Sequence, residues 1–215
     1  SLPLMSWATA LLLPAAASAA ANADFILASP NKRIEVRIRA GGGVRYDVLV
    51  NGAPVLRNAT ASINVDQVQL GREAQVREAG RQSVDRVLEP AVRQKAAAIR
   101  ERYNELRLDA GGGLAAVFRA FDEGVAYRLE TSMAAPQVTV FGEEAVFNFT
   151  SDYTVYYPQE ESFFSHNERK YTPQKLSAIG PKAIATLPAV VDAGGVKVAI
   201  AESDIEDYPG LWLRG

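Results

Sequence analysis

Residues 34–39 read Ile-Glu-Val-Arg-Ile-Arg, and this alternation of apolar and charged residues decides the fold class. Successive side chains of a strand point to opposite faces, so a period of two places the apolar residues on one buried face. Gly41–Gly43 then permits a turn, Val44–Val48 repeats the alternation, and Asn51-Gly52 readily adopts the positive φ of a tight turn. The stretch therefore predicts two consecutive β-hairpins.

The same pattern recurs through the rest of the chain. A three-stranded meander is expected from Tyr103–Asp109, Leu114–Phe121 and Val125–Glu130. Short strands regularly separated by turn residues are typical of a sandwich. We therefore predict that residues 24–215 form a single all-β, antiparallel domain. Further candidate strands, each bounded by turn residues, are Gln137–Phe141, Ala145–Phe149, Tyr153–Tyr157, Ile184–Leu187 and Val196–Ala201.

Two segments carry a different signal. Helix formers accumulate only in Pro90–Arg102, which is either a helix or an edge strand whose Lys and Arg side chains hinder pairing. Tyr208–Arg214 is aromatic and aliphatic, like the start of another strand, whereas chain ends are usually polar. We therefore expect the protein to continue beyond Gly215.

Residues 1–23 contain no charged residue and centre on the apolar run Trp7–Leu13. Small residues in the A-x-A arrangement of a cleavage site occur at Ala17–Ala19 and at Ala21–Ala23. The apolar run is far shorter than the roughly 20 residues that a transmembrane helix needs. We predict a signal peptide over residues 1–23, cleaved near Asp24, and hence a periplasmic or secreted protein without a membrane span.

The composition excludes several kinds of site. The chain has no cysteine, which excludes disulfides, thiolate metal sites and cysteine nucleophiles. The net charge is −2 with the two signs interspersed, so no basic stripe offers a nucleic-acid footprint. The single histidine, His166, has neither a G-x-S-x-G motif nor a second imidazole to accompany it, which argues against a Ser-His-Asp triad and a zinc site. We interpret His166 as a loop histidine and expect no nucleic-acid partner.

Two further motifs have both a structural and a functional interpretation. Gly41–Gly43 and Gly111–Gly113 join strand to strand, so we interpret them as turns rather than phosphate-binding loops. The tyrosine run Tyr153–Tyr157 could form a platform for a sugar ring, although aromatic residues of strands more often belong to the core or to cross-strand pairs.

The segment Val198–Tyr208 is the most informative, because an apolar strand runs into four acidic residues. If the chain stays extended, Glu202, Asp204 and Glu206 project on one side. Grouped carboxylates bind calcium or provide acid and base groups for glycosides, and they also occur as solvated strand ends. The spacing alone does not decide between these interpretations.

At this point the sequence resembles the N-terminal domain of glycoside hydrolase family 97. The resemblance covers essentially the whole chain after residue 23, with its motifs in the family's order. The motifs that carry it are Ser29–Ile34 (SPNKRI), Asn51–Leu56 (NGAPVL), Tyr103–Leu106 (YNEL), Phe118–Arg128 (FRAFDEGVAYR), Ser151–Thr154 (SDYT) and Ala199–Gly210 (AIAESDIEDYPG).

The resemblance implies an antiparallel β-super-sandwich of the galactose-mutarotase-like type that packs on a following (β/α)8 barrel. Family members are exported, calcium-dependent, exo-acting α-glucosidases and α-galactosidases of bacteria that act on oligosaccharides. Their catalytic carboxylates lie on the barrel, so the resemblance implies no catalytic residue and no turnover for this segment alone. By motif position, Glu202 corresponds to the one glutamate that this domain contributes to the calcium ion.

Two alternatives remain at this point. One is a free-standing, non-catalytic carbohydrate-binding β-sandwich, motivated by the tyrosine run. The other is an aldose mutarotase on a related sandwich, which needs imidazole groups and is hard to build with one histidine.

Overall fold

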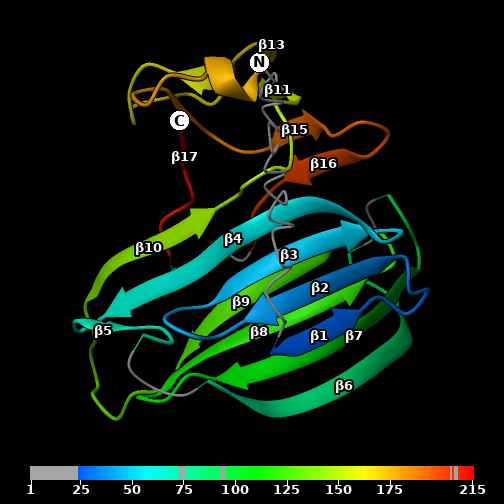
Figure 1. Ribbon diagram of the computed structural model, residues 1–215, viewed down its shortest axis with the longest axis vertical. Helices are drawn as coiled ribbons and strands as arrows, with labels where there is room; N and C mark the ends of the chain where they lie inside the picture. The colour runs from blue at the N-terminus through cyan, green and yellow to red at the C-terminus, as the bar shows by residue number, and fades with distance from the viewer. Residues whose placement is uncertain (1–23, 73–75, 93–94, 204, 206–207) are drawn as a thin grey trace, which may run out of the picture.

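The computed structural model describes residues 24–72, 76–92, 95–203, 205 and 208–215 (Figure 1). These residues form strands β1 to β17 and one turn of 3-10 helix, and the strands pair antiparallel throughout. The prediction of an all-β, antiparallel fold is confirmed. The predicted signal peptide, residues 1–23, lies outside the described residues and stays a prediction. Among the described residues, no helix has the length and apolar character required to cross a membrane.

Two large sheets pack face to face (Figure 1). In the first sheet the strand order is β1-β2-β3-β4-β10, and β5 pairs with β4; in the second it is β6-β7-β8-β9. The first sheet consists of β1 (Phe25–Ala28), β2 (Ile34–Arg39), β3 (Arg45–Val50), β4 (Ala53–Val65), β5 (Val68–Gln69) and β10 (Val140–Val146). The second consists of β6 (Arg77–Leu88), β7 (Ile99–Asp109), β8 (Leu114–Phe121) and β9 (Val125–Thr131).

The main core fills the space between these sheets. β2 buries Ile34, Val36 and Ile38 and leaves its charged residues half-exposed, as the period of two predicts. Phe118 of β8 is fully buried, and its ring meets Tyr46 of β3 edge to face at a centroid distance of 5.6 Å. The hydrophobic contact between the sheets therefore depends on strands whose pattern is visible in the sequence.

Seven shorter strands form two small sheets around a second core (Figure 1). This core contains the buried residues Val155, Tyr157, Ala185, Ala189 and Val191. The sequence pattern does not separate it from the main sandwich. The four-stranded sheet, in the order β13-β11-β15-β16, consists of β11 (Thr154–Tyr157), β13 (Thr172–Lys175), β15 (Ala189–Asp192) and β16 (Lys197–Ile200). The three-stranded sheet, β12-β14-β17, consists of β12 (Gln159–Glu160), β14 (Ile184–Ala185) and β17 (Leu213–Arg214), and the 3-10 turn η1 is Leu176–Ala178.

Several strand predictions need correction. Gln137–Phe141 and Ala145–Phe149 are not two strands, because β10 runs from Val140 to Val146 and pairs with β4 across both predictions. Of the two alternatives for Pro90–Arg102, the helix is wrong for the described part, and the end, Ile99–Arg102, is a strand that belongs to β7, inside the sheet rather than at its edge. In each case pairing with a neighbouring strand overrides the local pattern.

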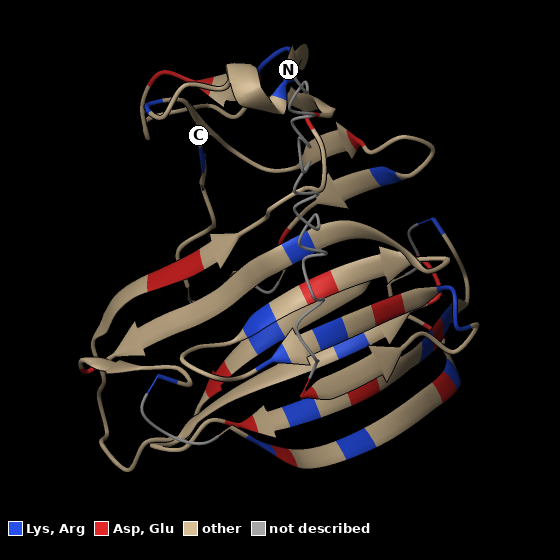
Figure 2. Cartoon of the chain, viewed as in Figure 1, with Lys and Arg blue, Asp and Glu red and all other residues tan. Residues whose placement is uncertain are grey.

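The edge strand β6 has no buried residue, so the period-two pattern does not reveal it. Cross-strand polar pairs accompany its pairing with β7, including the bidentate contact of Arg100 with Asp85, at 2.9 and 2.8 Å. Figure 2 shows positive and negative residues alternating along β6 and β7 of the second sheet. Exposed charged side chains on an edge strand also oppose pairing with another chain.

The glycine turns join strands as predicted. Asn51 and Gly52 have φ values of 51° and 80° between β3 and β4, and Gly111, Gly112 and Gly113 have positive φ between β7 and β8. At Gly113 a Cβ atom would lie 2.9 Å from the carbonyl oxygen of Ser132. This turn therefore requires glycine for steric as well as conformational reasons.

Gly113→Ala is expected to destabilise the domain by about 1–3 kcal/mol more than Gly42→Ala, measured by urea unfolding. Gly42 is the matched control because it has a similar φ of +72° but nothing within 4 Å of the added methyl group. The control therefore reports backbone strain alone, and Gly113→Ala adds the clash with Ser132. If both variants lose the same free energy of unfolding, the backbone at Ser132 moves aside without cost.

Candidate functional site

Glu202 lies two residues after β16, and its side chain is exposed. Its Oε2 atom accepts a hydrogen bond from the backbone N–H of Leu211 at 2.6 Å. The contact joins the end of β16 to the segment that leads into β17. One oxygen of the carboxylate is thus held by the backbone, and Oε1 accepts no hydrogen bond from the part of the chain that the structure describes.

A second carboxylate, Glu143 of β10, raises the pKa of two tyrosines that Glu202 also affects. Burial raises the pKa of Tyr208, and the charge of Glu143, a hydrogen bond to Glu143 and the charge of Glu202 raise it further. The pKa of Tyr127 on β9 is also raised, first by burial and then by the charges of Glu143 and Glu202. The charges of Glu143 and Glu202 therefore act on the same two tyrosines. Sequence reasoning missed Glu143, because its place depends on the pairing of β10 with β4.

This cluster does not form a complete metal site by itself. Among the described residues no group of three or more His, Asp and Glu side chains could hold an ion. Two of the acidic residues that the sequence places beside Glu202, Asp204 and Glu206, lie outside the described residues. Calcium takes six to eight oxygen ligands, so the carboxylates of the described residues do not by themselves complete a calcium site.

Glu160 of β12 is a buried carboxylate that the sequence analysis did not single out. Its side chain is fully enclosed, and it accepts hydrogen bonds from Ser165 Oγ and, at 2.9 Å, from Arg169 Nε. The hydrogen bond from Ser165 lowers the pKa of Glu160 against the effect of desolvation, and Arg169 lowers it further. Glu160 therefore remains ionised and fixes the loop that follows it.

The two other candidates from the sequence are His166 and the tyrosine run Tyr153–Tyr157, and neither forms a binding site among the described residues. His166 is an exposed loop residue whose Nδ1 accepts the backbone N–H of Glu168 at 3.1 Å, which confirms its interpretation as a loop histidine. The tyrosine run does not form a continuous platform, because Tyr157 is buried and Tyr153 packs against Phe149. Only Tyr156 of this run is exposed, since alternate residues of β11 face opposite sides.

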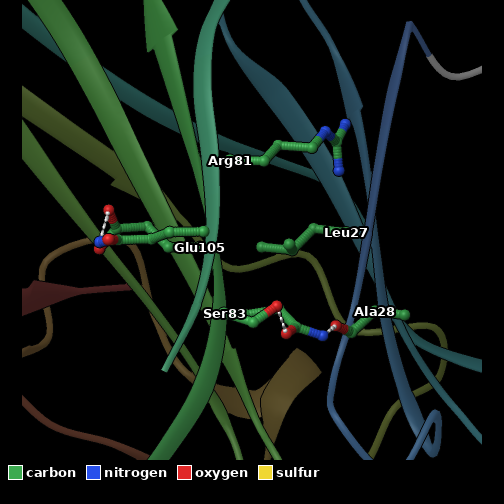
Figure 3. A pocket seen from close by; sticks show the side chains of 7 residues that line it. Leu27, Ala28, Arg81, Ser83 and Glu105 are labelled. Carbon is green, nitrogen blue, oxygen red and sulfur yellow. Dashed lines mark hydrogen bonds between the residues drawn. The ribbon is translucent and has the colours of Figure 1, made fainter. Parts of the chain in front are cut away.

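A groove lies at the edge of the sandwich, between β1 and β6 (Figure 3). Arg81 Nη1 donates to the carbonyl oxygen of Ile26, and Asn104 Nδ2 donates to that of Ala28, each at 2.8 Å. Arg81 and Asn104 belong to the second sheet and donate hydrogen bonds to carbonyl oxygens of the edge strand β1, so they join the two sheets. The groove therefore has a structural role.

The fold and the site together define a two-sheet β-sandwich domain with a smaller β extension, in which the exposed carboxylate of Glu202 is oriented by the backbone. The family model described as "Glycosyl-hydrolase 97 N-terminal" matches residues 27–215. The chain belongs to this family. This confirms the resemblance seen in the sequence.

A curated relative agrees with this assignment. Over 204 residues the chain is 36% identical to a retaining alpha-galactosidase of Bacteroides thetaiotaomicron. The match covers 90% of this chain and only 30% of the relative. The chain is thus equivalent to one domain of a longer glycoside hydrolase.

Solved structures share the fold. A glycoside hydrolase family 97 enzyme in complex with acarbose, from Pseudoalteromonas sp. strain K8, matches with a TM-score of 0.77 and 18% identity, over 89% of this chain and 30% of its own. A beta-arabinopyranosidase matches with a TM-score of 0.72 and 21% identity, over 84% of this chain and 32% of its own. At these identities the likeness supports the fold alone.

Proposed function

We propose that this chain is the N-terminal domain of an exported, exo-acting α-glycosidase of the α-galactosidase or α-glucosidase type. The observation that carries the proposal is the family match over residues 27–215 together with 36% identity to a retaining alpha-galactosidase. The chain spans about 30% of that relative, so we assign catalysis to the remainder. In this proposal the remainder contains a (β/α)8 barrel on which the domain packs, and oligosaccharides are the substrates.

Within this proposal Glu202 provides one ligand of a calcium ion shared between the two domains. Its exposed carboxylate, with Oε2 already oriented by Leu211, suits a ligand that faces a neighbouring domain. Bound calcium would polarise a sugar oxygen close to the glycosidic bond. The contribution of this chain is to hold the Glu202 carboxylate in position through the N–H of Leu211.

The test is hydrolysis of aryl α-galactosides and aryl α-glucosides by the full-length protein and by residues 24–215 alone. The full-length protein is expected to hydrolyse at least one of the two, to lose activity on chelation with EGTA, and to regain it with added calcium. Residues 24–215 alone are expected to show no turnover. Measurable turnover by this segment, or an inactive full-length protein, would contradict the proposal.

Export is tested separately from catalysis. Cell fractionation followed by mass spectrometry of the mature N-terminus is expected to place the protein outside the cytoplasm, starting near Asp24. A full-length cytoplasmic protein that retains residues 1–23 would remove export from the proposal and leave the glycosidase assignment untouched.

A further inference from the structure

The loop between β12 and β13 presents two phenylalanine side chains to solvent. Phe164 is 97% exposed and Phe163 is 69% exposed. Phe163 contacts Trp212 edge to face, at a ring-centroid distance of 4.9 Å. We refer to residues 161–169 as the aromatic loop. Large apolar side chains gathered on a surface usually mark an interaction site.

Polar contacts, two of them to the buried carboxylate of Glu160, cross-link the aromatic loop. The enclosed carboxylate of Glu160 binds Ser165 and Arg169, which lie on either side of the loop's second half. Ser162 Oγ accepts the backbone N–H of Phe164 at 3.2 Å, and Ser165 Oγ accepts that of Asn167 at 2.9 Å. The two rings are therefore presented from an ordered backbone, which lowers the entropy lost when a partner binds.

The position of the loop indicates which partner it meets. Trp212 directly precedes β17, so the aromatic cluster lies at the C-terminal end of the part of the domain that the structure describes. The family model is that of an N-terminal domain, and the curated relative extends far beyond the matched part. The small sheets around the loop are also sparsely covered, because β13, β16 and β17 contain no buried residue.

We propose that the aromatic loop docks this domain onto the catalytic domain that follows it, with Phe163 and Phe164 filling an apolar recess there. This inference rests on the proposed function, because it requires the two-domain arrangement. The buried Glu160 acts as a positioning residue that fixes the loop for docking.

The test measures thiol accessibility in the full-length protein. Phe164→Cys and the control Val87→Cys each place a cysteine in a segment that has none, and both positions are well exposed in this domain. Val87 lies on β6, at the far edge of the sandwich from the small sheets (Figure 1). Maleimide labelling at each position, followed by peptide mass mapping, is expected to be at least about tenfold slower at position 164, because docking covers it. Labelling of the two positions at equal rates would overturn the proposal.

A second measurement does not depend on cysteine. Phe164→Ser is expected to lower the midpoint of thermal unfolding of the full-length protein by about 2–4 °C, whereas Val87→Ser leaves it unchanged. An unchanged midpoint in Phe164→Ser would count against docking. If position 164 labels rapidly in the free protein and slowly with saturating oligosaccharide, the loop is a sugar-binding surface and the docking proposal is wrong.

These readouts do not require enzymatic activity. A protein that is inactive on α-glycosides but protected at position 164 would keep the docking inference and remove the proposed substrate class. An active protein with a freely labelled position 164 would remove the docking inference alone.

Discussion

Glu202→Gln in the full-length enzyme is expected to weaken calcium activation by about 10–100-fold, because even residues that only support metal ligands change affinity by this factor. Glutamine retains an oxygen that can accept the N–H of Leu211, so the local structure is kept while the charge is lost. The measurement is activity against free calcium concentration, titrated from the chelated protein. The concentration at half-activation is expected to rise, with folding unchanged by circular dichroism.

Glu123→Gln is the matched control, because Glu123 is an exposed glutamate in the turn between β8 and β9. It is expected to leave the calcium titration unchanged. An identical titration for wild type and Glu202→Gln would remove Glu202 from the metal site. The family assignment would then stand, and another residue would have to provide this ligand.

Phe118→Ala is expected to destabilise the domain by about 3–5 kcal/mol, the typical cost of removing a fully buried phenylalanine ring. Phe118 has no exposed surface and lies between the two large sheets, where it contacts Tyr46 and Tyr127. The lost ring leaves a cavity that paired strands cannot close without disrupting their hydrogen bonds. The measurement is the free energy of unfolding from urea titration.

Phe121→Ala provides the control within the same strand. Phe121 is half-buried and lies near the end of β8, where it contacts Tyr103. Phe121→Ala is expected to lower the free energy of unfolding clearly less than Phe118→Ala does. If both substitutions cost the same, the space between the large sheets would not be the main source of stability.

The two cores suggest a division of roles within the domain. The large sandwich supplies most of the buried apolar residues, whereas the small sheets carry Glu202 and the aromatic loop, which contact the neighbouring residues Leu211 and Trp212. A rigid sandwich that supports a small, functional extension keeps the binding groups on an ordered base. In the proposed enzyme, the extension is the part that reaches the catalytic domain.

The sequence by itself determined the fold class and several strands. The alternation at Ile34–Arg39 and the apolar run at Leu114–Phe121 predicted β2 and β8 with their observed bounds. The Asn51-Gly52 pair predicted a tight turn that has the expected positive φ at both residues. These features are local, because side-chain alternation and turn conformation depend on neighbours along the chain. The motif order also identified the family and drew attention to Glu202.

Only the tertiary structure decided which distant residues meet. Glu143 acts on the same tyrosines as Glu202 because β10 pairs with β4 at the edge of the first sheet, and no local pattern specifies that pairing. The edge strand β6 is polar on both faces, so it is defined by its register with β7 rather than by burial. The enclosure of Glu160 likewise depends on a loop folding back over it. Strand pairing joins segments remote in sequence, and its energy comes from the partner strand, which is why a single segment could not predict it.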